Sequence, residues 1–442
     1  MPVVFLVVTL IGLVGVANAY VPVRREPLTV PSFFWGWIYG ELPLQMIAWQ
    51  ALATALFIAA GALGGWEGWL GLVVAGASWI GLAGLAVSGA RASGVVNQAL
   101  ASATAPDLPV ADDLPTPLWG TRWRLAWAVP RPGRAIEVIR NVDYAGDGMR
   151  RHRADIIRPL AASGPAGARL PKPVMVYIHG GAWIIGDKRE QGRPMLYELA
   201  SRGWVCVTIN YRLSPRSSWP DHIVDCKRAV AWVKENIASY GGDPDFVAVS
   251  GGSAGGHLSA LLALTPEETS WQPGFEHADT SVAACVPFYG VMDMTGDQAG
   301  SGKYGPGLLE LLEDRVMKVK AAEHPEVFRA ASPTYRVHPG APPFFVLHGL
   351  NDTLVPIEVP RRFVAALREV SRAPVVYAEL PRTPHAFDVL LSARCRATTA
   401  GVVAFLEAIH QSRRAADPWG SASGAGPAPP PQDGPRGTGA VA

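Results

Sequence analysis

The sequence predicts an α/β protein: a doubly wound domain with a mostly parallel sheet, preceded by an N-terminal transmembrane helical region. Two observations support this division. Residues 1–100 contain only six charged side chains, whereas charged residues make up about 20% of the remaining chain. From about residue 134 to residue 411, short apolar runs alternate with amphipathic ones, as expected for strands and helices that follow one another.

Three uncharged stretches make up the apolar front of the chain. Each is long enough to cross a bilayer core, which takes roughly 20 residues. We predict a transmembrane region over residues 1–90, with spans at about residues 3–23, 43–65 and 69–89. Tryptophans flank the second and third spans, where amphipathic rings favour the headgroup layer.

The orientation in the membrane depends on the first stretch, which ends near Ala17-Asn18-Ala19. This motif is typical of a signal-peptide cleavage site, but no basic residues precede the stretch. If all three spans are retained, Arg24, Arg25 and Arg91 lie on one side of the membrane. The positive-inside rule then predicts a multi-pass protein of the cell membrane with a cytoplasmic C-terminal domain. Cleavage of the first span would place that domain outside the cytoplasm.

The remaining boundaries follow from composition. Residues 91–135, rich in Ala, Pro and Asp, are predicted to be a linker, and residues 136–415 to be the globular domain. Leucines at helical spacing within residues 290–335 predict a partial cap. Residues 416–442 are predicted to be a disordered tail, because a segment this rich in Pro and Gly cannot form a core.

The alternating segment defines the predicted sheet. Near-continuous Val, Ile and Phe runs are typical of strands buried on both faces of a parallel sheet. In such a sheet the functional groups follow the carboxyl ends of the strands. The predicted strands cover residues 135–142, 155–158, 174–179, 204–210, 246–250, 282–288, 344–348 and 375–380.

Charge and cysteine content exclude several functional classes. A net charge of +2 without a basic cluster excludes the usual nucleic-acid footprint, which needs massed Lys and Arg. The four cysteines are far apart and form no Cys-x-x-Cys or Cys/His cluster, so they predict neither a zinc site nor a disulfide framework.

A nucleophilic serine follows the strand at residues 246–250. Ser253 stands in Gly-Gly-Ser-Ala-Gly, directly before a predicted helix. A serine at a sharp strand-to-helix turn crowds the residues two positions away on each side, so glycine is needed there. Gly251 and Gly255 meet this demand and complete the G-x-S-x-G nucleophile elbow.

An oxyanion loop is predicted after the strand at residues 174–179. Acyl transfer needs backbone N–H donors near the developing oxyanion, and glycines allow close approach. The chain reads His-Gly-Gly-Ala-Trp at this point. We expect the hole to be formed by the N–H groups of Gly181, Ala182 and Ala254, with His179 and Gly180 supporting the loop.

The base and the acid are expected later in the chain, since hydrolases with this elbow order their triad as Ser, Asp or Glu, then His. His385 lies in a loop after the last predicted strand and before the final helix. Asp352 follows the strand at residues 344–348 and is the predicted acid. Asp293 is a weaker competitor, after the preceding strand. No metal or organic cofactor is expected for this chemistry.

These motifs resemble bacterial α/β-hydrolase carboxylesterases related to the hormone-sensitive-lipase group. The apolar front joined to this domain is similar to actinobacterial membrane-anchored esterases. Ala182 replaces the third glycine of the strict hormone-sensitive-lipase motif, and feruloyl-esterase-like and kynurenine-formamidase-like branches share this change. The resemblance covers roughly residues 174–408 and rests on His179–Trp183, Asn210–Pro215, Ser250–Leu258, His348–Asp352 and Pro384–Phe387.

The resemblance implies an α/β-hydrolase fold and a membrane-anchored serine carboxylesterase or lipase. The implied substrates are small-molecule or lipid esters with short to medium acyl chains. An amidase or formamidase, or a lipid acyltransferase, is the alternative on the same triad. A non-catalytic membrane scaffold is more remote, because such proteins typically lose a triad member. The sequence leaves the natural substrate and the oligomeric state open.

Overall fold

The centre of the molecule is one eight-stranded sheet. The computed structural model describes residues 1–25, 27–102, 128–160, 171–296 and 305–416. The strand order is β1-β2-β4-β3-β5-β6-β7-β8; β2 is antiparallel to both neighbours, and the strands from β4 to β8 are parallel. This is the predicted mostly parallel sheet. Its strands are β1 (Ile136–Asp143), β2 (Arg153–Pro159), β3 (Lys172–Ile178), β4 (Val205–Ile209), β5 (Gly242–Gly252), β6 (Ala284–Phe288), β7 (Phe344–Gly349) and β8 (Val375–Leu380).

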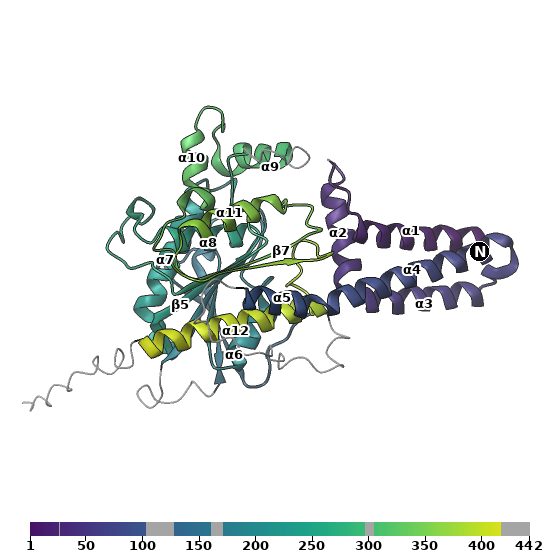
Figure 1. The fold of residues 1–442 in the computed structure, drawn as a ribbon, viewed down its shortest axis with the longest axis horizontal. Helices are drawn as coiled ribbons and strands as arrows, with labels where there is room; N and C mark the ends of the chain where they lie inside the picture. Colours follow the sequence, from purple (N-terminus) through teal and green to yellow (C-terminus); the bar gives the residue numbers. More distant parts are fainter. Residues whose placement is uncertain (26, 103–127, 161–170, 297–304, 417–442) are drawn as a thin grey trace, which may run out of the picture.

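Helices cover both faces of the sheet (Figure 1). Successive side chains of a strand point to opposite faces. On β3, therefore, Val174 and Val176 join one apolar core, while Met175 and Tyr177 join the other. The first core packs against α7 (Asp221–Asn236), α8 (Ala254–Leu264) and α11 (Glu358–Val370). The second packs against α5 (Ala92–Ala101), α6 (Arg193–Ser201) and α12 (Ala393–Ala416).

The N-terminal helices project from this domain (Figure 1). Helices α1 (Pro2–Tyr20), α3 (Pro43–Ala59) and α4 (Trp66–Ala90) form an elongated bundle, and α2 (Thr29–Glu41) lies across its end, beside the domain. The contact between α1 and α4 is close because α4 has glycines there: a Cβ at Gly71 would lie 2.9 Å from the Phe5 ring, and one at Gly81 would lie 2.5 Å from Val16.

Within the described part of the chain, two helices are long and apolar enough to cross a membrane. They are α1 and the nearly continuous helix Trp66–Ala101, which comprises α4 and α5. A third candidate arises if α2 and α3, which meet at an angle of 92°, count as one broken span. Each predicted span overlaps one of these helices, although α3 ends at Ala59, before the predicted end at residue 65.

The predicted linker differs from the structure at its start. Residues 92–101 form α5, and Val96 of this helix is buried in the second core. A Cβ at Gly401 of α12 would lie only 2.2 Å from Val96, so α5 packs tightly onto the domain. The sequence did not reveal this helix because its apolar residues continue the apolar pattern of α4. Residues 103–127 of the linker lie outside the described residues.

The stretch predicted as a partial cap contains short helices among its described residues. It contains α9 (Gly305–Leu311), a π-helix at Leu312–Met317 and α10 (Pro325–Ala330). Leu312 and Val316 are buried in the first core, so the leucine pattern contributes to ordinary packing. Residues 297–304 of this stretch, and residues 417–442 of the predicted disordered tail, lie outside the described residues.

Candidate active site

Ser253 lies at the turn between β5 and α8. Its backbone has φ 57° and ψ −120°, a conformation that residues with a side chain rarely adopt. A Cβ at Gly251 would lie 2.4 Å from the carbonyl oxygen of Gly255, and one at Gly255 would lie 2.0 Å from that of Ile178. Only glycine fits at either position. The Ser253 N–H donates to the carbonyl oxygen of Phe288 at 3.0 Å, which fixes the turn at the carboxyl edge of the sheet.

The His-Gly-Gly-Ala loop after β3 lies directly against this turn. A Cβ at Gly180 would lie 3.0 Å from the Cβ of Ser253. Gly181 and Ala182 both have positive φ, of 115° and 52°, so the loop turns sharply at these two residues. The Gly180 N–H donates to Gln191 Oε1 at 2.7 Å and is therefore engaged within the loop.

Three backbone N–H groups are candidates for binding an oxyanion. Gly181 and Ala182 contribute the two that follow the engaged Gly180 in the loop. The third belongs to Ala254, the first residue of α8. The N–H groups of a helix's first turn have no partner within the helix, and the helix dipole is positive at this end. The arrangement suits an anion held beside Ser253.

His179 begins the oxyanion loop and contacts it through its own ring. Its ring is buried and stacks on Tyr211, with ring centroids 4.5 Å apart. Its Nδ1 lies 2.7 Å from the carbonyl oxygen of Gly180, and the Tyr211 hydroxyl donates to the His179 carbonyl oxygen at 3.0 Å. Burial lowers the pKa of His179 to about 4, so the ring is neutral near pH 7. These contacts place His179 in a structural role.

Asp352 and His385 form a buried pair at the ends of β7 and β8. His385 Nδ1 lies 2.6 Å from Asp352 Oδ2. The other oxygen, Oδ1, accepts the N–H groups of Leu354 and Val355 at 2.8 and 2.9 Å. Burial raises the pKa of Asp352, but His385, His348 and the Val355 N–H outweigh burial and hold the pKa below its usual value. Asp352 is therefore ionised near pH 7.

Tyr289, which sequence reasoning missed, connects this pair to the elbow. It directly follows β6, and its ring centroid lies 4.4 Å from that of His385. A Cβ at Gly252, next to Ser253, would lie 2.7 Å from the Tyr289 hydroxyl oxygen. The elbow and His385 thus border the same side chain. The sequence signal that could have identified Tyr289 is its position directly after a strand. A tyrosine has no place in the Ser, Asp, His order, so that order does not select it.

Two other carboxylates, those of Asp293 and Asp388, have different partners. Asp293 Oδ1 accepts hydrogen bonds from the backbone N–H and the hydroxyl of Thr295, at 2.9 and 2.7 Å. Asp388 accepts a hydrogen bond from the Tyr289 hydroxyl, and burial raises its pKa to about 6. Among the residues that the structure describes, no group of three or more His, Cys, Asp or Glu side chains is arranged to hold a metal ion.

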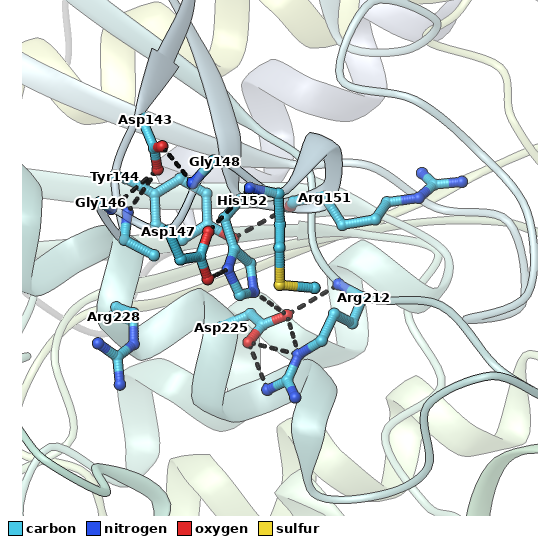
Figure 2. Close-up of polar contacts among 12 residues, drawn as sticks. Asp143, Tyr144, Gly146, Asp147, Gly148, Arg151, His152, Arg212, Asp225 and Arg228 are labelled. Atoms are coloured by element: carbon cyan, nitrogen blue, oxygen red, sulfur yellow. Dashed lines mark hydrogen bonds and ion pairs between the residues drawn. The ribbon is translucent and has the colours of Figure 1, made fainter.

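A polar cluster lies at the turn between β1 and β2 (Figure 2). His152 stands between two carboxylates: its Nδ1 lies 2.6 Å from Asp147 Oδ2, and its Nε2 lies 3.2 Å from Asp225 Oδ2. The preceding residue, Arg151, donates to the carbonyl oxygen of Gly186 at 2.8 Å. The turn between β1 and β2 therefore contacts α7 through Asp225, and it contacts the segment after the oxyanion loop through Gly186.

We expect His152→Gln to destabilise the protein mainly at acidic pH. Burial lowers the pKa of His152, but Asp225 and Asp147 outweigh burial and raise the pKa from its ordinary value. A raised folded-state pKa stabilises the fold below the unfolded-state value of about 6.5, and the effect is lost as pH rises through the folded-state pKa. Denaturant unfolding should show a loss of about 1.5–3 kcal/mol at about pH 5.5 and a smaller loss at about pH 9.

The matched control is His277→Gln, since His277 lies on the surface. This variant should unfold like the wild type at both pH values. An equal loss of stability at both pH values for His152→Gln would contradict the ionic role of His152.

Comparisons with known proteins identify related chains. The BD-FAE family model matches residues 162–367. "Probable carboxylic ester hydrolase LipM" of Mycobacterium tuberculosis is 50% identical over 302 residues, which cover 66% of this chain and 68% of that protein. "Esterase LipQ" of the same organism is 46% identical over 289 residues, covering 65% of this chain and 66% of that protein.

A solved structure shows the fold. The truncated form of a carbohydrate esterase from gut microbiota superposes with a TM-score of 0.53 at 24% identity, covering 64% of this chain and all of that one. Together with the mixed, mostly parallel sheet, this likeness establishes an α/β-hydrolase fold. The identity to LipM over two thirds of both chains establishes the activity class. The chain belongs to the α/β-hydrolase family of carboxylic ester hydrolases that includes LipM.

Proposed function

We propose that this chain is a membrane-anchored serine esterase that hydrolyses short- to medium-chain acyl esters through an acyl-enzyme on Ser253. The observation that carries the proposal is the buried Asp352–His385 pair. Tyr289 contacts the His385 ring on one side and borders the strained turn that holds Ser253 on the other. A nucleophile, a base and an orienting acid are the three groups that acyl transfer needs.

The proposed reaction has two halves. Ser253 Oγ attacks the acyl carbon of the ester while His385 Nε2 takes the hydroxyl proton. His385 then gives this proton to the leaving alcohol, and the acyl group stays on Ser253. In the second half, water loses a proton to His385 and attacks the acyl carbon. The bond between the acyl carbon and Ser253 Oγ then breaks, His385 returns the proton to Oγ, and the carboxylic acid leaves.

The acid and the backbone N–H donors stabilise the charges that form during the reaction. Asp352 accepts the Nδ1–H of His385, which selects the tautomer whose Nε2 is free to act as the base and stabilises the imidazolium that forms. The N–H groups of Gly181, Ala182 and Ala254 are the proposed donors to the oxyanion of the tetrahedral intermediates. Each such donor contributes about 3–4 kcal/mol of transition-state stabilisation in comparable enzymes.

A chain-length series tests the proposal. We expect the full-length protein in detergent to hydrolyse p-nitrophenyl esters, with kcat/KM highest for short and medium acyl chains and lower for long ones. The matching p-nitroanilides should react far more slowly, because the amine is a poorer leaving group. Hydrolysis of anilides as fast as esters would favour the amidase alternative, and no hydrolysis of any ester would refute the proposed activity.

We further propose that the N-terminal helices anchor the enzyme in the cell membrane through three retained spans. Outward positions on α4 carry apolar side chains, such as Val73 and Ile80, which are 69% and 77% exposed. The Tyr20 hydroxyl at the end of α1 donates to the carbonyl oxygen of Gly81 in α4 at 2.8 Å, which ties the first helix into the bundle. Arg24 and Arg91 lie at the end nearest the domain, so the positive-inside rule favours a cytoplasmic domain.

Reporter fusions test this orientation. Green fluorescent protein fused after Ala442 should fluoresce, whereas alkaline phosphatase at the same position should be inactive. Phosphatase inserted at Gly61, in the turn between α3 and α4, is the matched control and should be active. Active phosphatase after Ala442 would show that the domain lies outside the cytoplasm, as cleavage of α1 predicts.

A further inference from the structure

We infer that α1 and α2 complete the active site, because they hold the two loops that carry Asp352 and His385. In Figure 1, α2 lies between the helical bundle and the domain. Its contacts fall on residues that flank the acid and the base. The inference rests on the triad proposed above and goes beyond anchoring, since a simple tether has no need to touch catalytic loops.

The end of α1 is joined to the residue before the acid. Asn351 Nδ2 donates to the carbonyl oxygens of Ala19 and Tyr20, at 2.8 and 3.2 Å. The last carbonyl groups of a helix have no partner within the helix. Asn351 therefore caps α1, and the same contact fixes the backbone next to Asp352.

Two further contacts hold the acid loop. Arg24, in the connection between α1 and α2, donates through Nη2 to the carbonyl oxygen of Leu350 at 2.7 Å. On the other side of the acid, the hydroxyl of Thr353 lies 3.4 Å from the carbonyl oxygen of Thr29, the first residue of α2. The residues immediately before and after Asp352 thus both contact the N-terminal helices.

The inner face of α2 holds the base loop. The Phe33 ring meets the His385 imidazole edge-on, with centroids 5.9 Å apart and planes at 81°. One turn further, Trp37 Nε1 donates to the carbonyl oxygen of Ala386 at 2.9 Å. Ala386 has a positive φ of 59°, which a residue with a side chain adopts only when its surroundings hold it there. Trp37 supplies such a support next to His385.

A buried ion pair fixes the far end of α2. Glu41 accepts a hydrogen bond from the Ser392 hydroxyl at 2.5 Å, and its other oxygen lies 3.1 Å from Arg394 Nη1. Arg394 also donates to the carbonyl oxygen of Gly40 at 2.6 Å. All of these side chains are at most 4% exposed. Such a pair is demanding in its geometry, so it sets the position of α2 on the domain.

These contacts matter because the acid and base lie on loops. The backbone around Asp352 and His385 follows the ends of β7 and β8, where regular strand pairing stops. Backbone bonds join the two loops there: the Leu350 N–H donates to the carbonyl oxygen of Leu380 at 3.0 Å, and the Asn351 N–H donates to that of Thr383 at 2.9 Å. A base displaced by about 1 Å can cost 10²-fold in rate. Phe33 and Trp37 are therefore proposed as positioning residues that act through His385.

The test compares the two faces of α2 in the full-length protein. Phe33→Leu and Trp37→Phe change the inner face, and Phe34→Leu and Trp35→Phe are the matched changes at outer positions, which are 50% and 42% exposed. We would measure kcat and KM for p-nitrophenyl butyrate, a soluble ester that needs no membrane delivery. The rate of fluorophosphonate labelling and the Tm would be measured in parallel.

We expect the inner variants to lose about 10- to 100-fold in kcat and in labelling rate, with KM within about twofold of the wild type. The outer variants should match the wild type, and all four should stay folded. Inner variants with the same kcat as the outer ones would overturn the inference. If an inner variant fails to fold, Arg24→Gln is the alternative. It removes the hydrogen bond from the connection between α1 and α2 to the carbonyl oxygen of Leu350, and it should lower kcat without changing KM.

The outcomes separate this inference from the proposed function. If Ser253→Ala hydrolyses the ester as fast as the wild type, both the proposed function and the role of α1 and α2 are refuted. A wild-type protein with Ser253-dependent hydrolysis and unaffected inner variants would refute only the role of α1 and α2.

Discussion

Ser253→Ala is expected to lower kcat for ester hydrolysis by about 10⁴- to 10⁶-fold. The loss is large because the acyl-enzyme route disappears with the hydroxyl, and His385 and Asp352 then have no nucleophile to activate. The small residual rate should come from the oxyanion donors and substrate binding alone. Steady-state kinetics with a p-nitrophenyl ester measure the effect, and circular dichroism should show an unchanged fold.

The control for this variant is Ser250→Ala, three residues earlier. Ser250 is buried in β5, and its hydroxyl donates to the carbonyl oxygen of Val286 at 2.7 Å. Its loss should cost about 1 kcal/mol of stability and leave kcat near the wild-type value. Hydrolysis by Ser253→Ala at the wild-type rate would refute the assignment of the nucleophile.

Asp352→Asn is expected to lower kcat by about 10⁴-fold while the protein stays folded. The asparagine amide can donate to His385 Nδ1, which favours the tautomer that carries its proton on Nε2. That tautomer cannot accept the proton of Ser253. Because Asp352 Oδ1 also accepts two backbone N–H groups, the amide oxygen can keep those contacts, and the loss should appear in kcat rather than in folding.

Asp293→Asn distinguishes the two acids that the sequence left in competition. Asp293 accepts hydrogen bonds from Thr295, and its replacement should change kcat by less than about twofold. A large loss in Asp293→Asn combined with a small loss in Asp352→Asn would contradict the assignment of the acid.

Much of the domain could be predicted because its signals are local. Each of the eight strands overlaps a short Val-, Ile- or Phe-rich run, since strands buried on both faces need such runs. The elbow was visible because steric crowding leaves only glycine at two fixed positions around Ser253. The triad order then limited the base to histidines late in the chain. The structure brings Asp352 and His385 together at 2.6 Å, while their role in catalysis is still a prediction.

The contacts between the N-terminal helices and the catalytic loops could not be predicted in this way. Asn351 and its partner Ala19 are more than 300 residues apart, and nothing in either segment specifies the other. Trp37 is one of the tryptophans that precede the second apolar stretch, a position that favours the headgroup layer, whereas in the structure its Nε1 donates to the carbonyl oxygen of Ala386. In a uniformly apolar region hydropathy shows which residues avoid water, but packing decides which neighbour each one contacts.

Mapping the covalent adduct tests the central claim most directly. The full-length protein would be inactivated with a fluorophosphonate, digested and analysed by mass spectrometry. The proposed mechanism predicts a single adduct on the peptide that contains Ser253, loss of ester hydrolysis in proportion to labelling, and no adduct in Ser253→Ala. An adduct on a different residue, or full labelling of Ser253→Ala, would contradict it.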